Sequence, residues 1–157
     1  MNRTLRSFTL AAALGVGLAF TTVAAENAAD QPQHAHKHLG GPNGGRLLET
    51  QPRAEFFVEK DRRVIIRFYN EDLKPVAASE QTVTVIAEAK SGKVKIEFAK
   101  DGDALRSQTT LPEGDGYNLV VQVRPKAGVK PQNFRFKLDL ATCQECQRLE
   151  YACTCEH

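Results

Sequence analysis

Hydrophobic and polar residues alternate with a period of two over much of the chain. Residues 93–98 alternate without a fault, so that Val94, Ile96 and Phe98 share one face and their charged neighbours share the other. Residues 133–140 repeat the pattern. Because successive side chains of a β-strand point to opposite faces, this period is typical of a strand that buries one side. We therefore predict strands at both places.

Further segments are enriched in the β-branched and aromatic residues that favour strands. They cover residues 54–59, 63–69, 82–89 and 117–124, and 104–110 is a less regular candidate. Turn-forming clusters separate them, and no segment shows a helical period. Six or seven short strands joined by frequent turns predict an all-β domain over residues 46–140, an antiparallel β-sandwich of immunoglobulin-like type. A small barrel is the alternative.

Residues 1–25 have the composition of a secretory signal peptide. Arg3 and Arg6 supply positive charge, an apolar run follows at residues 10–20, and small residues at 23–25 offer a cleavage site. The apolar run is about half as long as the ~20 residues that a membrane-spanning helix needs. We therefore expect an exported protein of the cell envelope with no membrane span in the mature chain.

Export changes the charge balance. Arg3 and Arg6 leave with the signal peptide, so the 21 basic residues become 19 and equal the 19 acidic ones. Binding to nucleic acid by bulk electrostatics needs a basic face, so we expect no such partner. The predicted domain holds no His or Cys, no Ser/His/Asp set and no phosphate-binding glycine loop. Its acidic residues fall mostly in turns or on outward strand positions, and we expect no enzymatic activity.

Residues 26–45 lack apolar periodicity and end in a glycine-rich run, which is typical of a flexible arm. The arm carries His34, His36 and His38, three of the four histidines of the chain. Neutral imidazole binds Zn, Cu or Ni. A spacing of two places all three rings on one side of an extended segment. We expect weak to moderate, exchangeable metal binding.

The tail, residues 141–157, concentrates metal-binding side chains. A C-x2-C pair and a C-x-C pair are joined by a six-residue spacer, and a histidine ends the chain; the five candidate ligands are Cys143, Cys146, Cys153, Cys155 and His157. Four thiolates, or three with His157, complete a tetrahedral Zn site, and fewer suffice for Cu(I). The sequence therefore predicts a bound Zn or Cu ion here.

Disulfides are the alternative interpretation of the four cysteines. Exported compartments are oxidising, and cross-pairing between the two Cys pairs has reasonable geometry. The protein would then be a disulfide-stapled β-sandwich that docks on an envelope protein and has no metal role. A redox C-x2-C is a third option, although the βαβ pattern of thioredoxins is not present.

Two segments resemble proteins of heavy-metal efflux. Residues 40–48, G-G-P-N-G-G-R-L-L, follow a His-rich arm and resemble the start of the periplasmic adaptor proteins of RND-type heavy-metal efflux pumps. Residues 151–157, Y-A-C-T-C-E-H, resemble the tail of small exported proteins encoded beside such pumps. Asn43 stands where the adaptor motif often has His, so no ligand role is carried to it. The chain also has no room for the long helical hairpin and lipoyl domain of a full adaptor.

The resemblance implies a standalone periplasmic accessory protein. It would bind, buffer or deliver transition-metal ions for heavy-metal resistance, and its partner would be an RND-type efflux pump or the periplasmic adaptor of such a pump.

Overall fold

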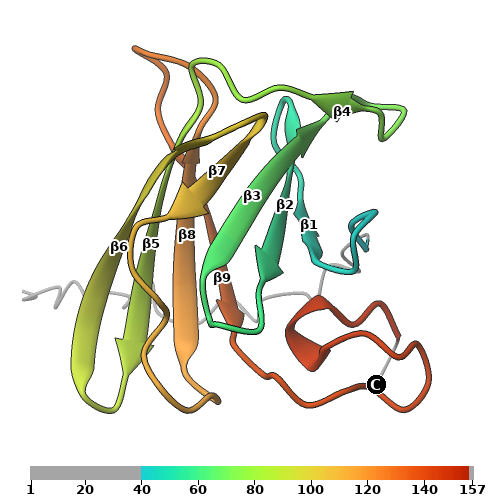
Figure 1. Ribbon diagram of the computed structural model, residues 1–157, viewed down its shortest axis with the longest axis vertical. Coiled ribbons are helices and arrows are strands. Elements are labelled where there is room, and N and C mark those ends of the chain that lie inside the picture. The colour runs from blue at the N-terminus through green and yellow to red at the C-terminus, as the bar shows by residue number, and fades with distance from the viewer. Residues whose placement is uncertain (1–39, 156–157) are drawn as a thin grey trace, which may run out of the picture. The chain divides into compact units, whose positions relative to one another are not determined.

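The strands of the protein are antiparallel and form one continuous path of hydrogen-bonded neighbours (Figure 1). The computed structural model describes residues 40–155. They form nine strands and one short 3-10 helix: β1 (Arg46–Leu48), β2 (Arg53–Val58), β3 (Val64–Tyr69), β4 (Pro75–Val76), β5 (Thr82–Ala89), β6 (Gly92–Asp101), β7 (Ala104–Ser107), β8 (Asn118–Arg124), β9 (Gln132–Lys137) and η1 (Glu150–Ala152). The path runs β1-β2-β3-β7-β6-β5-β8-β9, and β4 pairs with β3.

Strand β6 belongs to both walls of the fold: it connects the wall of β5, β8 and β9 to the wall of β1, β2, β3 and β7. Its residues up to Glu97 pair with β5, whereas Phe98 and the three residues after it pair with β7. A strand that changes partner along its length turns a corner between two layers. The result is a nearly closed, barrel-like sheet (Figure 1). The all-β, antiparallel prediction is confirmed. The immunoglobulin-like sandwich is not confirmed, because β6 belongs to both walls instead of ending in one.

Alternate side chains of the strands meet in a common apolar core. The inward residues of β2 and β8 are all buried in it: Ala54, Phe56, Val58, Leu119, Val121 and Val123. The inward side chains of β5 and β6 join the same core. Burial of apolar surface is the main favourable term in folding, so this core stabilises the body of the protein without any ligand.

Each of the seven predicted strands corresponds to an observed strand, and β5 has the predicted bounds. The predicted strand at residues 133–140 ends earlier, since β9 stops at Lys137. Strands β1 and β4 were not predicted, because three and two residues are too few to show a period.

Residues 40–45, which we interpreted as the end of the arm, form a turn that packs on β2. The Gly41 N–H donates to the Gly45 carbonyl at 2.8 Å. A Cβ atom at Gly41 would lie 2.3 Å from the Glu55 side chain, and one at Gly45 would lie 2.4 Å from the Phe56 carbonyl oxygen. Only glycine permits so close an approach. The glycines of this run therefore serve close packing on the sheet.

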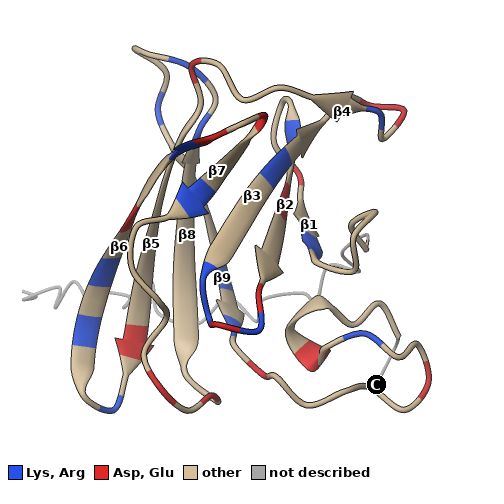
Figure 2. Cartoon of the chain, in the orientation of Figure 1, with Lys and Arg blue, Asp and Glu red and all other residues tan. Residues whose placement is uncertain are grey.

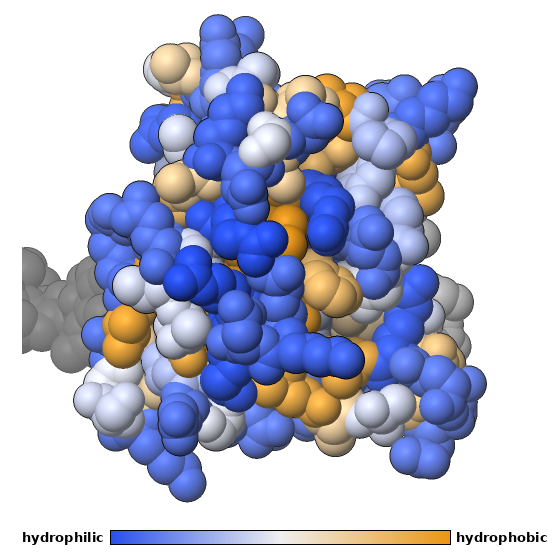
Figure 3. All heavy atoms as spheres, in the orientation of Figure 1, coloured by the Kyte–Doolittle hydropathy of each residue, from blue (hydrophilic) through white to orange (hydrophobic). Residues whose placement is uncertain are grey.

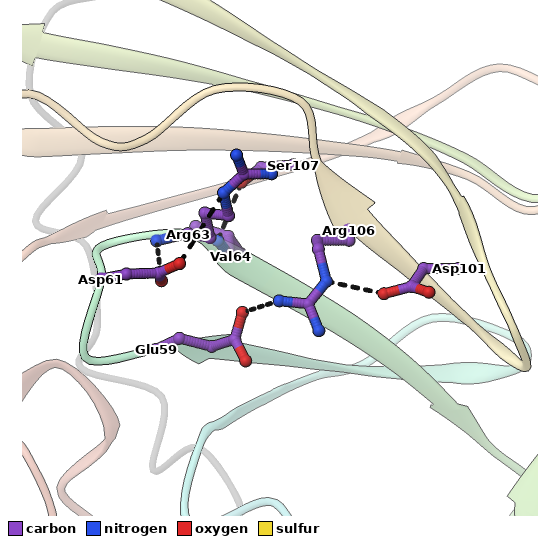
Figure 4. Close-up of polar contacts among 7 residues, drawn as sticks. All are labelled: Glu59, Asp61, Arg63, Val64, Asp101, Arg106 and Ser107. Atoms are coloured by element: carbon purple, nitrogen blue, oxygen red, sulfur yellow. Dashed lines mark hydrogen bonds and ion pairs between the residues drawn. The ribbon is translucent and has the colours of Figure 1, made fainter.

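Charged side chains of both signs are interspersed over the strands and turns (Figure 2). The face seen in Figure 3 is mostly hydrophilic, with smaller apolar patches between charged residues. Arg106 of β7 pairs with both Glu59 and Asp101 (Figure 4). The next side chain, Ser107, is buried, and its hydroxyl accepts the Val64 N–H at 2.9 Å. Within residues 40–155, no helix is long and apolar enough to span a membrane.

Candidate metal centre

The chain after β9 folds back on itself and makes a tight loop around the first cysteine pair. An isolated bridge between Thr142 and Leu149 closes the loop. Inside it, the Cys143 N–H donates to the Arg148 carbonyl at 2.8 Å, and the Gln147 N–H donates to the Cys143 carbonyl at 3.0 Å. Gln147 has a φ of 59°, a left-handed conformation that is uncommon for a residue with a side chain. This reversal lets both cysteines of the C-x2-C pair face the same centre.

The second pair follows the helix η1. The Glu150 N–H donates to the Ala141 carbonyl at 2.9 Å, and the Tyr151 N–H donates to the Asp139 carbonyl at 3.0 Å. These bonds hold η1 against the start of the segment. Cys153 then leaves the helix in an extended conformation, with a φ of −63° and a ψ of 137°. The six-residue spacer therefore returns the chain to the first pair.

The four sulfur atoms form one compact cluster. All four Sγ atoms lie within 4.8 Å of one another. The Sγ atom of Cys153 is 3.3 Å from that of Cys143 and 3.6 Å from that of Cys146, and the Cys143 and Cys155 sulfurs are 3.9 Å apart. A tetrahedron with Zn–S bonds of about 2.3 Å has edges of about 3.8 Å. The observed spacing matches that edge, whereas a disulfide bond measures about 2.05 Å. No disulfide joins these four cysteines.

Burial and backbone dipoles divide the four sulfurs into different environments. Cys143 and Cys153 are buried, whereas Cys146 and Cys155 are partly exposed. Hydrogen bonds from the backbone N–H groups of Arg148 and Thr154 favour the thiolate of Cys146 and lower its pKa to about 6. Burial raises the pKa of Cys153 and of Cys155. A divalent cation deprotonates the thiols that coordinate it, so all four sulfurs can serve as thiolate ligands of an ion.

Tyr151 fastens the cysteine segment to the core of the sheet. Its side chain is only 2% exposed. Its ring meets Phe56 edge-on, with centroids 5.9 Å apart, and stacks on Phe136 at 6.4 Å. The Val58 N–H donates to the Tyr151 hydroxyl at 3.0 Å, and Arg46 donates to the Tyr151 carbonyl at 3.2 Å. Because Cys153 follows Tyr151 by two residues, these contacts hold the cysteine cluster against the sheet.

Arg148 makes a second connection between the cysteine loop and the sheet. Its guanidinium donates to the Gly41 carbonyl at 3.1 Å and to the Gly45 carbonyl at 3.5 Å. Both carbonyls belong to the turn of residues 40–45, which packs on Glu55 and Phe56 of β2. The cysteine loop is therefore attached to the sheet twice, through Arg148 and through Tyr151.

The structure brings together four of the eight predicted metal ligands: Cys143, Cys146, Cys153 and Cys155. The other four, His34, His36, His38 and His157, lie outside the described residues. Four thiolates already complete a tetrahedral set. Sequence reasoning did not single out Tyr151 or Arg148. The signal that could have found Tyr151 is a large aromatic residue between cysteines in an otherwise polar segment.

A buried carboxylate was also missed, because the alternation of β2 places Glu55 on the outward face. The side chain is nevertheless completely buried under the turn of residues 40–45. It accepts the backbone N–H groups of Asn43 and Gly45 at 2.8 and 2.9 Å, the Asn43 side-chain amide at 2.7 Å and the Tyr69 hydroxyl at 2.8 Å. Burial, with the hydrogen bond to Glu55, raises the pKa of Tyr69 to about 12. These contacts use both carboxylate oxygens, and the network is structural.

Comparison with protein-family models, with curated proteins and with solved structures finds no match to this chain.

Proposed function

We propose that this protein is a periplasmic metal-binding accessory of a heavy-metal efflux or resistance system, where it captures, buffers or delivers transition-metal ions. The observation that carries the proposal is the cluster of four cysteine sulfurs at the spacing of a tetrahedral metal site. Soft thiolate ligands favour Zn(II) and Cu(I) over hard cations such as Mg(II). A closed set of four thiolates leaves no open position for a substrate, which fits holding an ion better than catalysis.

The proposed location and partner rest on the sequence. The signal-peptide pattern of residues 1–25 supports export, and the resemblance of residues 40–48 and 151–157 to efflux components supports an RND-type pump or its adaptor as partner. In this proposal His34, His36 and His38 collect ions loosely, and the cysteine centre holds one ion tightly. His157, two residues after Cys155, is a candidate for replacing one thiolate in the ligand set.

Metal titration of the mature protein under reducing conditions tests this function. Zn(II), Cu(I) and Ni(II) are added to the wild type and to a variant with all four cysteines changed to Ser, and Co(II) serves as a probe because its thiolate complexes absorb strongly. We expect tight binding of one ion that is lost in the variant. His157→Ala, as the matched tail variant, tests whether the histidine is a ligand. Equal affinities of the wild type and the four-Ser variant would refute the metal centre.

Mass spectrometry of protein purified from the periplasm tests the competing interpretation as a disulfide-stapled module. The Sγ atoms of Cys143 and Cys153 are 3.3 Å apart, so oxidation can join this pair with a small movement. We expect four reduced cysteines and a retained ion. Two disulfides with no ion would favour the interaction module instead.

A further inference from the structure

A hollow beside strands β3 and β4 lies apart from the candidate metal centre. Strand β4 pairs with the last residues of β3 (Figure 1), and the hollow of about 630 Å³ is lined by these strands, by the turn of residues 40–45 and by the turn between β6 and β7. Its surface is mostly apolar. Residues 40–155 expose three large apolar side chains, and two of them, Leu73 and Val76, line this hollow. They offer apolar contact area to a ligand.

Arg67 of β3 brings a positive charge to the hollow. It belongs to the lining and is half-buried. Its Cζ atom lies 5.7 Å from the centroid of the Phe57 ring. Among residues 40–155, however, no group accepts a hydrogen bond from its guanidinium, and the Nη1 atom is buried without an acceptor. A guanidinium carries five N–H donors, and donors that are buried without an acceptor cost free energy.

Glu55 does not satisfy these donors. It is the register partner of Arg67 on β2, so the two side chains lie on the same face of the sheet. Both carboxylate oxygens of Glu55 are nevertheless occupied by donors from the turn of residues 40–45 and from Tyr69. The charge of Glu55 therefore balances that of Arg67 only at a distance, and the N–H groups of Arg67 remain for an acceptor from outside the protein.

Two other acidic side chains limit the charge that a ligand can carry. Asp101 and Asp103 belong to the same lining, and Asp101 forms an ion pair with Arg106 instead of Arg67. A ligand with one negative charge can meet Arg67. A second negative charge on the ligand would be repelled by the two carboxylates.

From these observations we infer that the hollow binds a small organic monocarboxylate with an apolar body. The carboxylate accepts charge-assisted hydrogen bonds from Arg67, which are stronger than neutral ones. The aliphatic part lies against Leu73 and Val76, and its removal from water adds to the affinity. Binding makes and breaks no covalent bond. The site goes beyond the proposed function, because none of the four cysteines lines it.

A titration of the isotope-labelled mature chain with hexanoate at low ionic strength, followed by amide chemical shifts, tests the site. We expect saturable shifts centred on Val76 and Ala104, with a Kd on the order of millimolar. Arg67→Gln should weaken binding at least about tenfold, because it removes the charge that meets the carboxylate. Arg135→Gln is the matched control: it removes a partly exposed arginine that pairs with Glu88, and we expect the wild-type Kd.

A rim variant and two further probes separate this site from weaker alternatives. Val76→Ser changes an exposed side chain, so the fold is retained even if Arg67→Gln unfolds, and we expect it to weaken hexanoate binding at least about threefold. 1-Hexanol, which has the same chain without the charge, and inorganic phosphate should both bind at least about tenfold more weakly than hexanoate.

Three results would overturn the inference. The first is an absence of saturable shifts around Val76 in the wild type. The second is an unchanged Kd in a folded Arg67→Gln variant, because Arg67 would then only balance Glu55. The third is binding of 1-hexanol or phosphate as tight as that of hexanoate, because the hollow would then be a plain apolar surface or a general anion site. None of these results bears on the cysteine centre, which metal titration tests separately.

Discussion

The strands and the cysteine segment, residues 141–155, differ in how much apolar surface they bury. The body buries apolar side chains from β2, β3, β5 and β8 in one core. Among residues 141–155, the buried side chains other than cysteine are those of Tyr151 and Ala152, which join this core, and Leu149 packs against it. So short a segment buries too little apolar surface to offset the entropy of ordering its backbone, unless other bonds contribute. We therefore expect the order of the cysteine segment to depend on a bound ion as well as on the contacts of Tyr151 and Ala152 with the core.

Metal removal is the strongest way to break this comparison. Structural metal sites contribute their binding free energy directly to folding. With a chelator present, we expect the amides of Cys143, Gln147 and Tyr151 to lose hydrogen-exchange protection by orders of magnitude. The amides of β5 and β8 should keep theirs. Equal loss of protection in both regions, measured by hydrogen exchange with mass spectrometry, would show that the segment and the sheet form one cooperative unit.

The anchor that joins the two regions is tested by Tyr151→Ala. Removing a buried aromatic side chain leaves a cavity between Phe56 and Phe136, and we expect a loss of about 3–5 kcal/mol in the free energy of unfolding. Tyr151→Phe keeps the ring but leaves the Val58 N–H without its acceptor, so we expect a loss of about 1–2 kcal/mol. Urea denaturation of both variants with the metal bound provides the measurement. A loss below about 1 kcal/mol for the alanine variant would mean that the segment is not anchored by this ring.

The buried carboxylate of the body is tested by Glu55→Gln. The amide can accept at one oxygen only, so donors from Asn43, Gly45 or Tyr69 lose their partner, and we expect a cost of about 2–3 kcal/mol. Glu97→Gln is the matched control, because Glu97 is exposed and pairs with Lys95 on the surface. Its expected effect is under about 1 kcal/mol. Similar urea midpoints for the two variants would contradict the importance of the buried network.

The smallest expected effect is a loss of stability at alkaline pH. Burial raises the pKa of Tyr151 to about 12, and burial with the Glu55 hydrogen bond raises that of Tyr69 to about 12, from an ordinary value of 10.0. The unfolded chain then loses these protons first, so the stability that the two tyrosines contribute is complete below pH 10 and is lost between pH 10 and 12. Burial lowers the pKa of Arg46 to about 10, and this shift makes stability rise with pH over the same interval. The loss from the two tyrosines is larger than this gain.

Urea unfolding at a series of pH values measures that slope. Tyr151→Phe removes one of the two titrating groups, so its stability should fall less steeply over the same interval. A slope that is unchanged in this variant would show that Tyr151 is not protected from ionisation in the folded state.

The sequence by itself determined the strands and the cysteine pairs. An alternation such as that of residues 93–98 has only one stable solution, a strand with one buried face, because the side-chain period of a strand is two. The spacings C-x2-C and C-x-C likewise bring cysteines together locally, since a tight turn is enough. Both signals are local, and local signals can be read along the chain.

Contacts between distant residues were decided only by the tertiary structure. The short strands β1 and β4 form because they pair with the longer strands β2 and β3. Glu55 occupies an outward position of β2 but is buried, because a turn ten or more residues away in the chain covers it. The same holds for Tyr151, whose ring packs against Phe56 from a strand far earlier in the chain. Burial depends on which surfaces meet, and no pattern within a segment encodes which distant segment will cover it.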